Sequence, residues 1–277
     1  MKKNERAAAI VRTIVVSLIA VLFVVPLVWM VLSSLKTAPE VFARPFHWLP
    51  ARVQWQNYAT VWMNEEASML RAFANTLYIA LFSIIGQMFI SSLAAYSFAT
   101  INFKGKQVVF MLFLSSMMVP SQLTIIPRFM LFKTIGLYNN LWAIILPAFF
   151  GATSIFMLRQ FYMGLPNDLI EAAKIDGAGH LRIFLRIMLP LTKAALMSLI
   201  ILAFISSWNE YMAPLIFLVK KELYTVSQNI QWYMLDEFKE HNLTMAAATS
   251  AIVPVVILFI VGQKYFVEGI ATSGVKG

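Results

Sequence analysis

The chain has 277 residues, of which 60% are hydrophobic and 13% charged, with a net charge of +9 and no cysteine. Soluble domains carry about 25% charged residues, and here the deficit comes from long charge-free runs, which indicates a multi-pass helical membrane protein. Disulfides and thiolate chemistry are excluded, the scattered His47, His180 and His241 predict no metal site, and basic residues beside apolar runs argue against nucleic acid as a partner.

Six apolar runs are long enough to cross about 30 Å of hydrocarbon, which takes about 20 helical residues each. Transmembrane helices are therefore expected over residues 13–32, 75–99, 107–127, 141–163, 189–212 and 245–262. Pro120 and Pro147 fall inside the third and fourth runs, where neighbouring helices can satisfy the freed carbonyls. The predicted fold class is all-α integral membrane, with six transmembrane helices.

The first run admits two interpretations, because it follows Lys2, Lys3, Arg6 and Arg12. A secretory signal peptide also begins with positive charge. This stretch is longer than the usual apolar region of a signal peptide and lacks an A-x-A-like cleavage site. We therefore favour an uncleaved transmembrane helix.

Basic residues predict the orientation of the helices. With the amino terminus inside, thirteen of the 22 Lys and Arg residues lie in inner segments, as is typical of cytoplasmic loops. Six crossings then place both termini in the cytoplasm. The two long outer segments, 33–74 and 213–244, contain aromatic clusters of the kind that anchor helices at the membrane interface, and the second is also expected to contact an external partner.

A short segment between the fourth and fifth runs carries helix start and stop signals. Pro166 and Asn167 are typical of a helix start, Asp168 complements its positive end, and Gly177 and Gly179 are typical of a helix end. A helix of about ten residues is therefore expected to begin at Asp168. On a helical wheel its apolar side contains Leu169, Ile170, Ala172 and Ala173, and its polar side contains Asp168, Glu171 and Lys174.

This helix is too short to cross a bilayer or to be stable alone, so it needs a surface to pack against. One alternative is an interfacial helix lying on lipid. Its small, alanine-rich apolar side makes a poor lipid anchor, which favours a protein partner. The chain contains no G-x-x-x-x-G-K-[ST] phosphate loop. If ATP powers this protein, another chain must bind it.

The same segment resembles the EAA loop of importer permeases of the ATP-binding-cassette superfamily. That pattern is E-A-A, three residues, G, nine residues, then I-x-L-P, and it is matched at every spacing by Glu171, Ala172, Ala173, Gly177, Ile187, Leu189 and Pro190. The resemblance implies a type I ABC importer permease fold with a MetI-like core. It also implies that the loop, at about 165–190, forms a coupling helix that seats on the ATPase through Asp168, Glu171, Ala172, Ala173, Asp176 and Gly177.

Further stretches narrow the resemblance. Residues 208–215, Trp-Asn-Glu-Tyr-Met-Ala-Pro-Leu, are similar to the W-N-[DE]-[YF]-x-x-P-L stretch of carbohydrate permeases like the smaller membrane subunit of the maltose transporter. Residues 75–77, 265–270 and 274–277 fit as well, whereas Thr272 and Ser273 depart from a tail that more often has small residues. The expected organisation is an amino-terminal tail, first helix and external loop at 1–70, a permease core at 71–264 and a cytoplasmic tail at 265–277.

The resemblance implies a passive subunit of an ATP-driven importer in the bacterial cytoplasmic membrane. Its expected partners are the lipid bilayer, a homologous permease forming a heterodimer, an ABC ATPase dimer and an extracytoplasmic solute-binding protein. The chain itself is expected to be no enzyme and to hold no cofactor, since the ATPase subunits bind ATP. The expected solute is a mono- or oligosaccharide. The alternative solute is a sugar acid, a polysaccharide fragment or glycerol phosphate.

Polar side chains follow helical stripes that face the bundle interior. The stripes are Thr76, Ser83, Gln87 and Ser91; Ser115 and Gln122; and Ser198, Ser206, Asn209 and Glu210. One interpretation is helix-to-helix hydrogen bonding. The other is a solute path, with candidate contacts from Gln87, Ser115, Gln122, Ser206, Asn209 and Glu210. Glu210 is the only acid near a helix interior, and it could equally cap a helix end.

Two other function classes fit the sequence less well. An ion-driven secondary transporter usually has more helices, internal repeats and mid-membrane ionisable groups, none of which is evident in the sequence. An intramembrane enzyme needs a nucleophile with a base, or paired carboxylates, at membrane depth. The sequence contains no H-E-x-x-H or G-x-S-x-G motif and no facing pair of acids.

Overall fold

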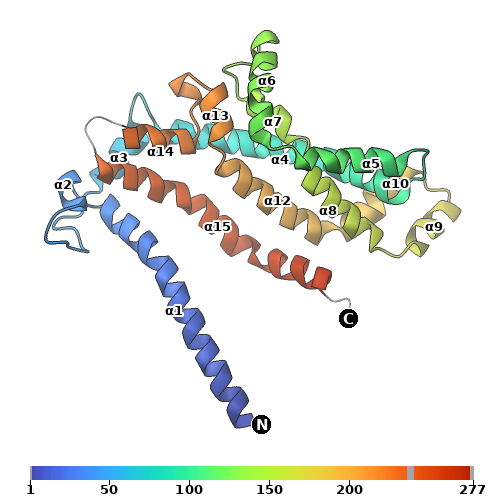
Figure 1. Cartoon of the computed structure of the whole chain (residues 1–277), viewed down its shortest axis with the longest axis horizontal. Helices are drawn as coiled ribbons and strands as arrows, with labels where there is room; N and C mark the ends of the chain where they lie inside the picture. Colours follow the sequence, from blue (N-terminus) through green and yellow to red (C-terminus); the bar gives the residue numbers. More distant parts are fainter. Residues whose placement is uncertain (1, 236–239, 275–277) are drawn as a thin grey trace. The chain divides into compact units, whose positions relative to one another are not determined.

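The computed structural model describes residues 2–235 and 240–274, and the side chains within 8–235 and 240–263. The described residues form helices and connecting loops without any strand (Figure 1). The α-helices are α1 Lys2–Ser34, α2 Ala38–Val41, α3 Gln56–Met63, α4 Met69–Thr100, α5 Lys106–Ser115, α6 Ser121–Thr134, α7 Trp142–Ala148, α8 Ala152–Met163, α9 Asp168–Ile175, α10 His180–Ile183, α11 Leu189–Leu191, α12 Lys193–Trp208, α13 Met212–Phe217, α14 Val226–Leu235 and α15 His241–Gly274. A π-helical turn, Phe184–Met188, joins α10 to α11.

Helix length and composition agree with a membrane protein of up to six crossings. Four stretches are long and apolar enough to cross a bilayer: Ala8–Ser34, Met69–Thr100, Trp142–Met163, which combines α7 and α8, and His241–Gln263. Two bent pairs can each supply one more, Lys106–Met118 with Ser121–Thr134 and His180–Leu191 with Lys193–Trp208. The predicted all-α membrane fold is confirmed.

The third predicted span is not one continuous helix, so that prediction is wrong in detail. α5 and α6 meet at a bend of 96° (Figure 1). Val119 is extended, with φ −84° and ψ 113°, because the ring of a following proline disfavours helical geometry. α6 then starts after Pro120, runs through Pro127 and ends at Thr134, beyond the predicted limit.

The fourth and fifth spans also differ from the prediction. Non-helical residues 149–151 separate α7 from α8, just after Pro147. The fifth span begins at Lys193, after a bend of 76° at Thr192, and ends at Trp208 rather than continuing to residue 212. Helices α1, α4 and α15 extend past their predicted ends, since polar residues at a span's end can continue a helix outside the hydrocarbon.

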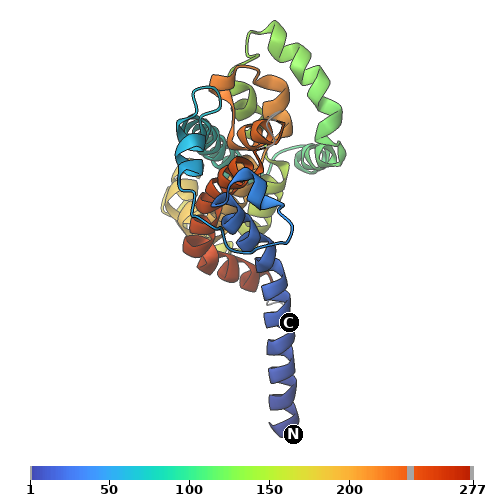
Figure 2. The same cartoon turned by 90° about the vertical axis from the view of Figure 1, so that its left-hand side faces the viewer.

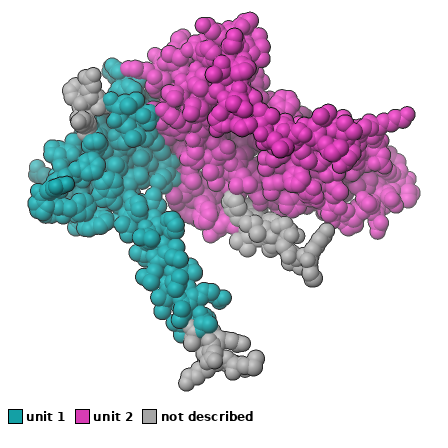
Figure 3. Space-filling model, viewed as in Figure 1, with its two compact units in different colours: residues 1–70, 229–253 teal, residues 71–228, 254–277 magenta. Residues whose placement is uncertain are grey.

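The chain divides into two compact units (Figure 3). Unit 1 comprises residues 1–70 and 229–253, and unit 2 comprises 71–228 and 254–277. The limits predicted from the sequence, 1–70, 71–264 and 265–277, stay predictions. The carboxy-terminal motif at 265–277 lies outside the described side chains, and 275–277 lie outside the described residues.

Unit 1 begins with α1, which is continuous despite Pro26 (Figure 2). None of its most apolar 18-residue window is buried, so its side chains are available to lipid or to another subunit. After α1, the ammonium of Lys36 is buried, donates to the carbonyl of His47 and lies 5.2 Å from the Phe46 ring centroid. Thr37 donates to Glu40 from its backbone N–H at 2.9 Å and from its hydroxyl at 3.0 Å, which lowers the pKa of that carboxyl.

A buried amide ties the segment after α1 to other parts of unit 1. The Nδ2 of Asn57 donates to the carbonyls of Ser34 and Lys36, both at 2.8 Å. Its Oδ1 accepts from the Nδ2 of Asn242 at 3.0 Å, at the start of α15. Three chain segments distant in sequence therefore depend on one side chain.

Asn57→Ala is expected to destabilise the protein by at least about 2 kcal/mol, because buried polar groups left without partners cost about 1–3 kcal/mol each. In thermal unfolding of the detergent-purified protein, this corresponds to a fall in Tm of at least about 4 °C. Gln56→Ala, at the exposed neighbouring position of α3, should leave Tm unchanged. Equal Tm values for the two variants would show that the amide does not tie these segments.

The core of unit 2 contains residues from α4, α8, α9, α10 and α12. Tyr96, Leu158, Tyr162, Phe184 and Leu199 are among its buried members. Tyr96 connects several of these helices: its ring lies 5.4 Å from that of Phe184 and 6.3 Å from that of Tyr162. This packing fixes the segment after α8 against the membrane-spanning helices of the unit.

Candidate functional site

The short helix predicted at Asp168 is present as α9, with eight residues. Gly177 ends it in the left-handed region, with φ +76°, where a residue with a Cβ is strained. The N–H of Gly177 donates to the Lys174 carbonyl at 3.0 Å, and the N–H of Ala178 donates to the Ala173 carbonyl at 2.9 Å. These bonds satisfy carbonyls that the helix end leaves free and aim the chain toward α10.

The predicted apolar side of α9 is split, which corrects the helical-wheel expectation. Ile170 and Ala173 are buried, with 7% and 8% of their surface exposed. Leu169 and Ala172 lie on the exposed side. Successive residues turn by about 100°, so an eight-residue helix held by one i, i+3 pair cannot also bury their neighbours.

The exposed side of α9 combines acidic and apolar residues. Ile175 is 86% exposed within the described structure, next to exposed Asp176 and Ala172. Five of the six expected docking residues are exposed: Asp168, Glu171, Ala172, Asp176 and Gly177. The sixth, Ala173, lies in the core, where it anchors the helix. This surface therefore offers both charged and apolar groups to whatever covers it.

α10 connects this surface to α4. The hydroxyl of Tyr96, near the end of α4, is 3.1 Å from Nδ1 of His180, the first residue of α10. The π-helical turn and the bend at Thr192 follow directly. α9 is thereby connected to α4 and α12 through packed side chains.

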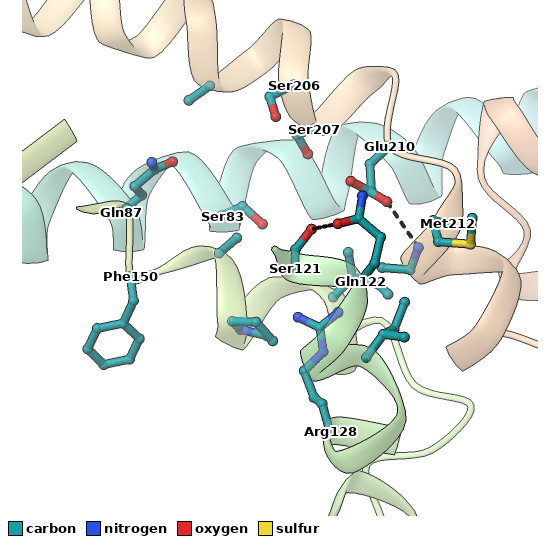
Figure 4. A pocket seen from close by; sticks show the side chains of 17 residues that line it. Ser83, Gln87, Ser121, Gln122, Arg128, Phe150, Ser206, Ser207, Glu210 and Met212 are labelled. Atoms are coloured by element: carbon teal, nitrogen blue, oxygen red, sulfur yellow. Dashed lines mark hydrogen bonds between the residues drawn. The ribbon is translucent and has the colours of Figure 1, made fainter. Parts of the chain in front are cut away.

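A cavity of about 420 Å³ lies elsewhere in unit 2, within the usual size range of ligand pockets. Residues of α4, α6, the α7–α8 break, α12 and α13 surround it (Figure 4). Its polar lining residues are Ser83, Gln87, Ser121, Gln122, Arg128, Ser206, Ser207 and Glu210. Hydroxyls and amides predominate, which is the chemistry that hydrogen-bonds a polyhydroxylated solute.

Four of the six residues expected along a solute path line this cavity: Gln87, Gln122, Ser206 and Glu210. The other two do not. Ser115 donates to the Met111 carbonyl at 2.9 Å, one helical turn back, before the break that redirects the chain. Asn209 lies just past the end of α12, and its amide donates to the Ile205 carbonyl at 2.8 Å.

Several polar residues also make the hydrogen bonds of the alternative interpretation. The amide of Gln87 donates to the Ser154 hydroxyl of α8 at 3.0 Å. Glu210 accepts the N–H of Ala213 at 3.0 Å and thereby caps the start of α13. Thr76, predicted only as a stripe member, accepts the N–H of Val226 at 2.9 Å. Structural hydrogen bonding and cavity lining therefore coexist on these helices.

Sequence reasoning missed Arg128 as a lining residue, because the third span was expected to end at 127. Spacings of four and three residues place Ser121, Ile125 and Arg128 on one face of α6. That spacing is a signal that the sequence contained. The guanidinium carbon of Arg128 lies 5.1 Å from the ring centroid of Phe217 in α13.

Comparison with known proteins identifies relatives that match almost the whole chain. The sequence model of the family described as "Binding-protein-dependent transport system inner membrane component" matches residues 87–272. The arabinooligosaccharides transport system permease protein AraQ of Bacillus subtilis is 33% identical, over 96% of this chain and 95% of its own. The melibiose/raffinose/stachyose import permease protein MelC of Bacillus subtilis is 30% identical, over 96% of each chain. The sn-glycerol-3-phosphate transport system permease protein UgpE of Pectobacterium atrosepticum is 29% identical, over 94% of each.

Solved structures show the same fold. A chain of a bacterial ABC transporter involved in the import of the acidic polysaccharide alginate superposes with a TM-score of 0.83 at 23% identity, over 95% of this chain and 98% of its own. A chain of the bacterial alginate transporter in complex with an alginate pentasaccharide-bound periplasmic protein gives 0.67 at 15% identity, over 95% and 94%. The chain therefore shares its overall fold with these solved chains.

Proposed function

Because the chain belongs to the family of binding-protein-dependent transport system inner membrane components, we propose that its solute is a mono- or oligosaccharide that crosses the membrane through the cavity between α4, α6 and α12. The chain is a permease subunit of an ABC importer and performs no bond chemistry itself. The observation that carries the proposal is a cavity of about 420 Å³ whose polar lining consists mainly of hydroxyls and amides, in a chain that is 60% hydrophobic.

Polar groups in a membrane-spanning bundle are costly unless they have partners or face water. A saccharide presents many hydroxyls, each able to donate and accept, so it can bond to serine and glutamine side chains in several orientations. AraQ and MelC are named for oligosaccharide solutes, which favours the same class here. A solute with an acidic or phosphate group is the second candidate, favoured by Arg128 in the cavity wall.

The proposed assembly pairs this chain with a homologous permease, above an ABC ATPase dimer that binds and hydrolyses ATP. An extracytoplasmic protein delivers the solute, as the periplasmic protein in one solved relative would. Both termini lie in the cytoplasm, and the exposed side of α9 docks on the ATPase. The large exposed apolar surface of Ile175 supports this site, since a partner would cover it.

Movement of α9 would reach the cavity through the core of unit 2. Ile170 and Ala173 fix α9 to that core, and α9 lies at the opposite end of unit 2 from α6 and α13 (Figure 1). Closure of the ATPase dimer would displace α9 and then α10 and α12. Ser206 and Ser207 lie at the carboxy-terminal end of α12. The cavity would thereby open alternately to the two sides of the membrane.

The proposal predicts that reconstituted vesicles take up labelled oligosaccharide only when the partner permease, the ATPase with ATP and the binding protein are all present. Uptake should be insensitive to ionophores, because no ion gradient drives it. Initial rates with and without ATP, and with and without ionophore, measure both dependencies. Uptake that persists without ATP and collapses with an ionophore would identify a secondary transporter instead.

A further inference from the structure

Arg128 brings a charged group into a cavity wall that otherwise consists mainly of neutral groups (Figure 4). It lies on α6, within one of the two bent pairs that can span the membrane. Its Nε is buried and has no hydrogen-bond partner among the described residues. A cation at such a place is expensive and usually marks a solute path.

Phe217 compensates for part of that cost. Its ring lies beneath the guanidinium at 5.1 Å and is itself fully buried. The attraction between a cation and an aromatic ring favours this placement of the guanidinium, but it leaves Nε without a hydrogen-bond partner. The Arg128 side chain is therefore held in place while its Nε donor stays without a partner among the described residues.

Glu210 lines the same cavity as Arg128, but its carboxylate is already used in a hydrogen bond to the backbone. Its Oε1 accepts the N–H of Ala213 at 3.0 Å, at the start of α13. Its charge attracts Arg128, but within the described residues no hydrogen bond or close ion pair joins the two side chains. The cavity thus holds a guanidinium whose hydrogen-bonding capacity is free for a ligand.

We propose that Arg128 is a specificity-determining residue that binds an oxyanion, a carboxylate or a phosphate, on a polyhydroxylated solute. The inference rests on the proposed function, since it places the solute in this cavity. A guanidinium matches an oxyanion with two parallel hydrogen bonds, which are about twice as strong as bonds between neutral groups. Gln122, Ser121 and Ser206 supply neutral partners for the hydroxyls of the same solute.

The test measures binding to the complete permease–ATPase complex in nanodiscs without the binding protein, so that the delivery protein does not choose the solute. The probes are two matched pairs: a galacturonate trisaccharide with its neutral galactose counterpart, and glycerol 3-phosphate with glycerol. At least one acidic probe should bind about tenfold more tightly than its neutral counterpart, a difference of about 1.4 kcal/mol. The pair that shows the preference identifies carboxylate or phosphate as the recognised group.

Arg128→Gln should reduce that preference to within about twofold while leaving the affinity for the neutral probe unchanged. Arg128→Lys should retain part of it, because the charge remains but the planar fork is lost. Glu210→Gln removes a nearby negative charge and should increase the preference. Lys133→Gln makes the same charge change as Arg128→Gln on α6, outside the cavity lining, and should have no effect.

Equal binding of the acidic and neutral probes in both pairs, or an unchanged preference in Arg128→Gln, would overturn the inference. If ATP-driven uptake of the neutral oligosaccharide then still occurs, the proposed function stands without it. Failure of the wild-type importer to bind or transport any of these saccharides or polyols would instead overturn the proposed function, and the role of Arg128 with it.

Discussion

Replacing Gly177 by proline should abolish ATP-driven uptake while the chain still inserts into the membrane at its normal level. Gly177 has φ +76°, whereas a proline ring holds φ near −65°. Proline also removes the N–H that donates to the Lys174 carbonyl at 3.0 Å. The turn after α9 would be redirected, and the docking surface would no longer meet the ATPase. We expect initial uptake to fall at least about 100-fold, since displacements of about 1 Å have effects of that size at sites that need exact geometry.

Two matched variants separate this effect from a general loss of structure. Gly179→Ala, two residues on, should retain uptake, because Gly179 has φ −72° and an added Cβ meets nothing within 4 Å. Gly177→Asn should retain part of it, since asparagine tolerates left-handed geometry. Uptake, co-purification of the ATPase and the amount of chain in the membrane are measured together. Wild-type uptake in Gly177→Pro would refute the coupling role of α9.

The sequence predicted what depends on local signals. The spans follow from apolar length, and the end of α9 follows from Gly177, because capping preferences act within one turn of the chain. Asn167 precedes α9 as predicted, although its side chain makes no capping bond. The buried pair Ile170 and Ala173 could not be chosen from the helical wheel. An apolar side of four residues leaves two i, i+3 pairs open, and the core of unit 2 accepts only one of them.

The breaks in the spans depend on tertiary structure. Pro120 and Pro147 were both expected to lie inside continuous helices, yet the helical turn before Pro120 ends at Met118 and α7 ends at Ala148, just after Pro147. Pro127 lies inside α6 without breaking it. The same residue type thus has different outcomes, because whether neighbouring groups satisfy a freed carbonyl is decided by packing that the sequence does not show. Because the chain bends after α5 and continues as α6, Arg128 lies in a helix and lines the cavity. The sequence had placed it just beyond the end of a span.

Gly151→Ala is expected to lower both stability and uptake, although its backbone suits any residue, with φ −100° and ψ 92°. The constraint is space: an added Cβ would overlap the side-chain amide of Gln87 in α4. That amide donates to Ser154 and lines the cavity. Gln87 can turn away but then loses its bond to Ser154, which costs about 0.5–1.5 kcal/mol, and thermal unfolding measures this loss. Gly164→Ala, at the other end of α8, places its Cβ no nearer than 3.4 Å to a carbonyl oxygen and should be tolerated.

A double-mutant cycle then distinguishes this contact from a general intolerance at Gly151. Gln87→Ala removes the obstructing amide, so the double variant should be more stable than the sum of the two single effects by about 0.5–3 kcal/mol. Strict additivity would mean that Gln87 is not the side chain that excludes a larger residue. Uptake need not recover with stability, because the double variant still lacks the Gln87 amide in the cavity wall. Recovered stability with low uptake would therefore separate the packing role of Gln87 from its contact with the solute.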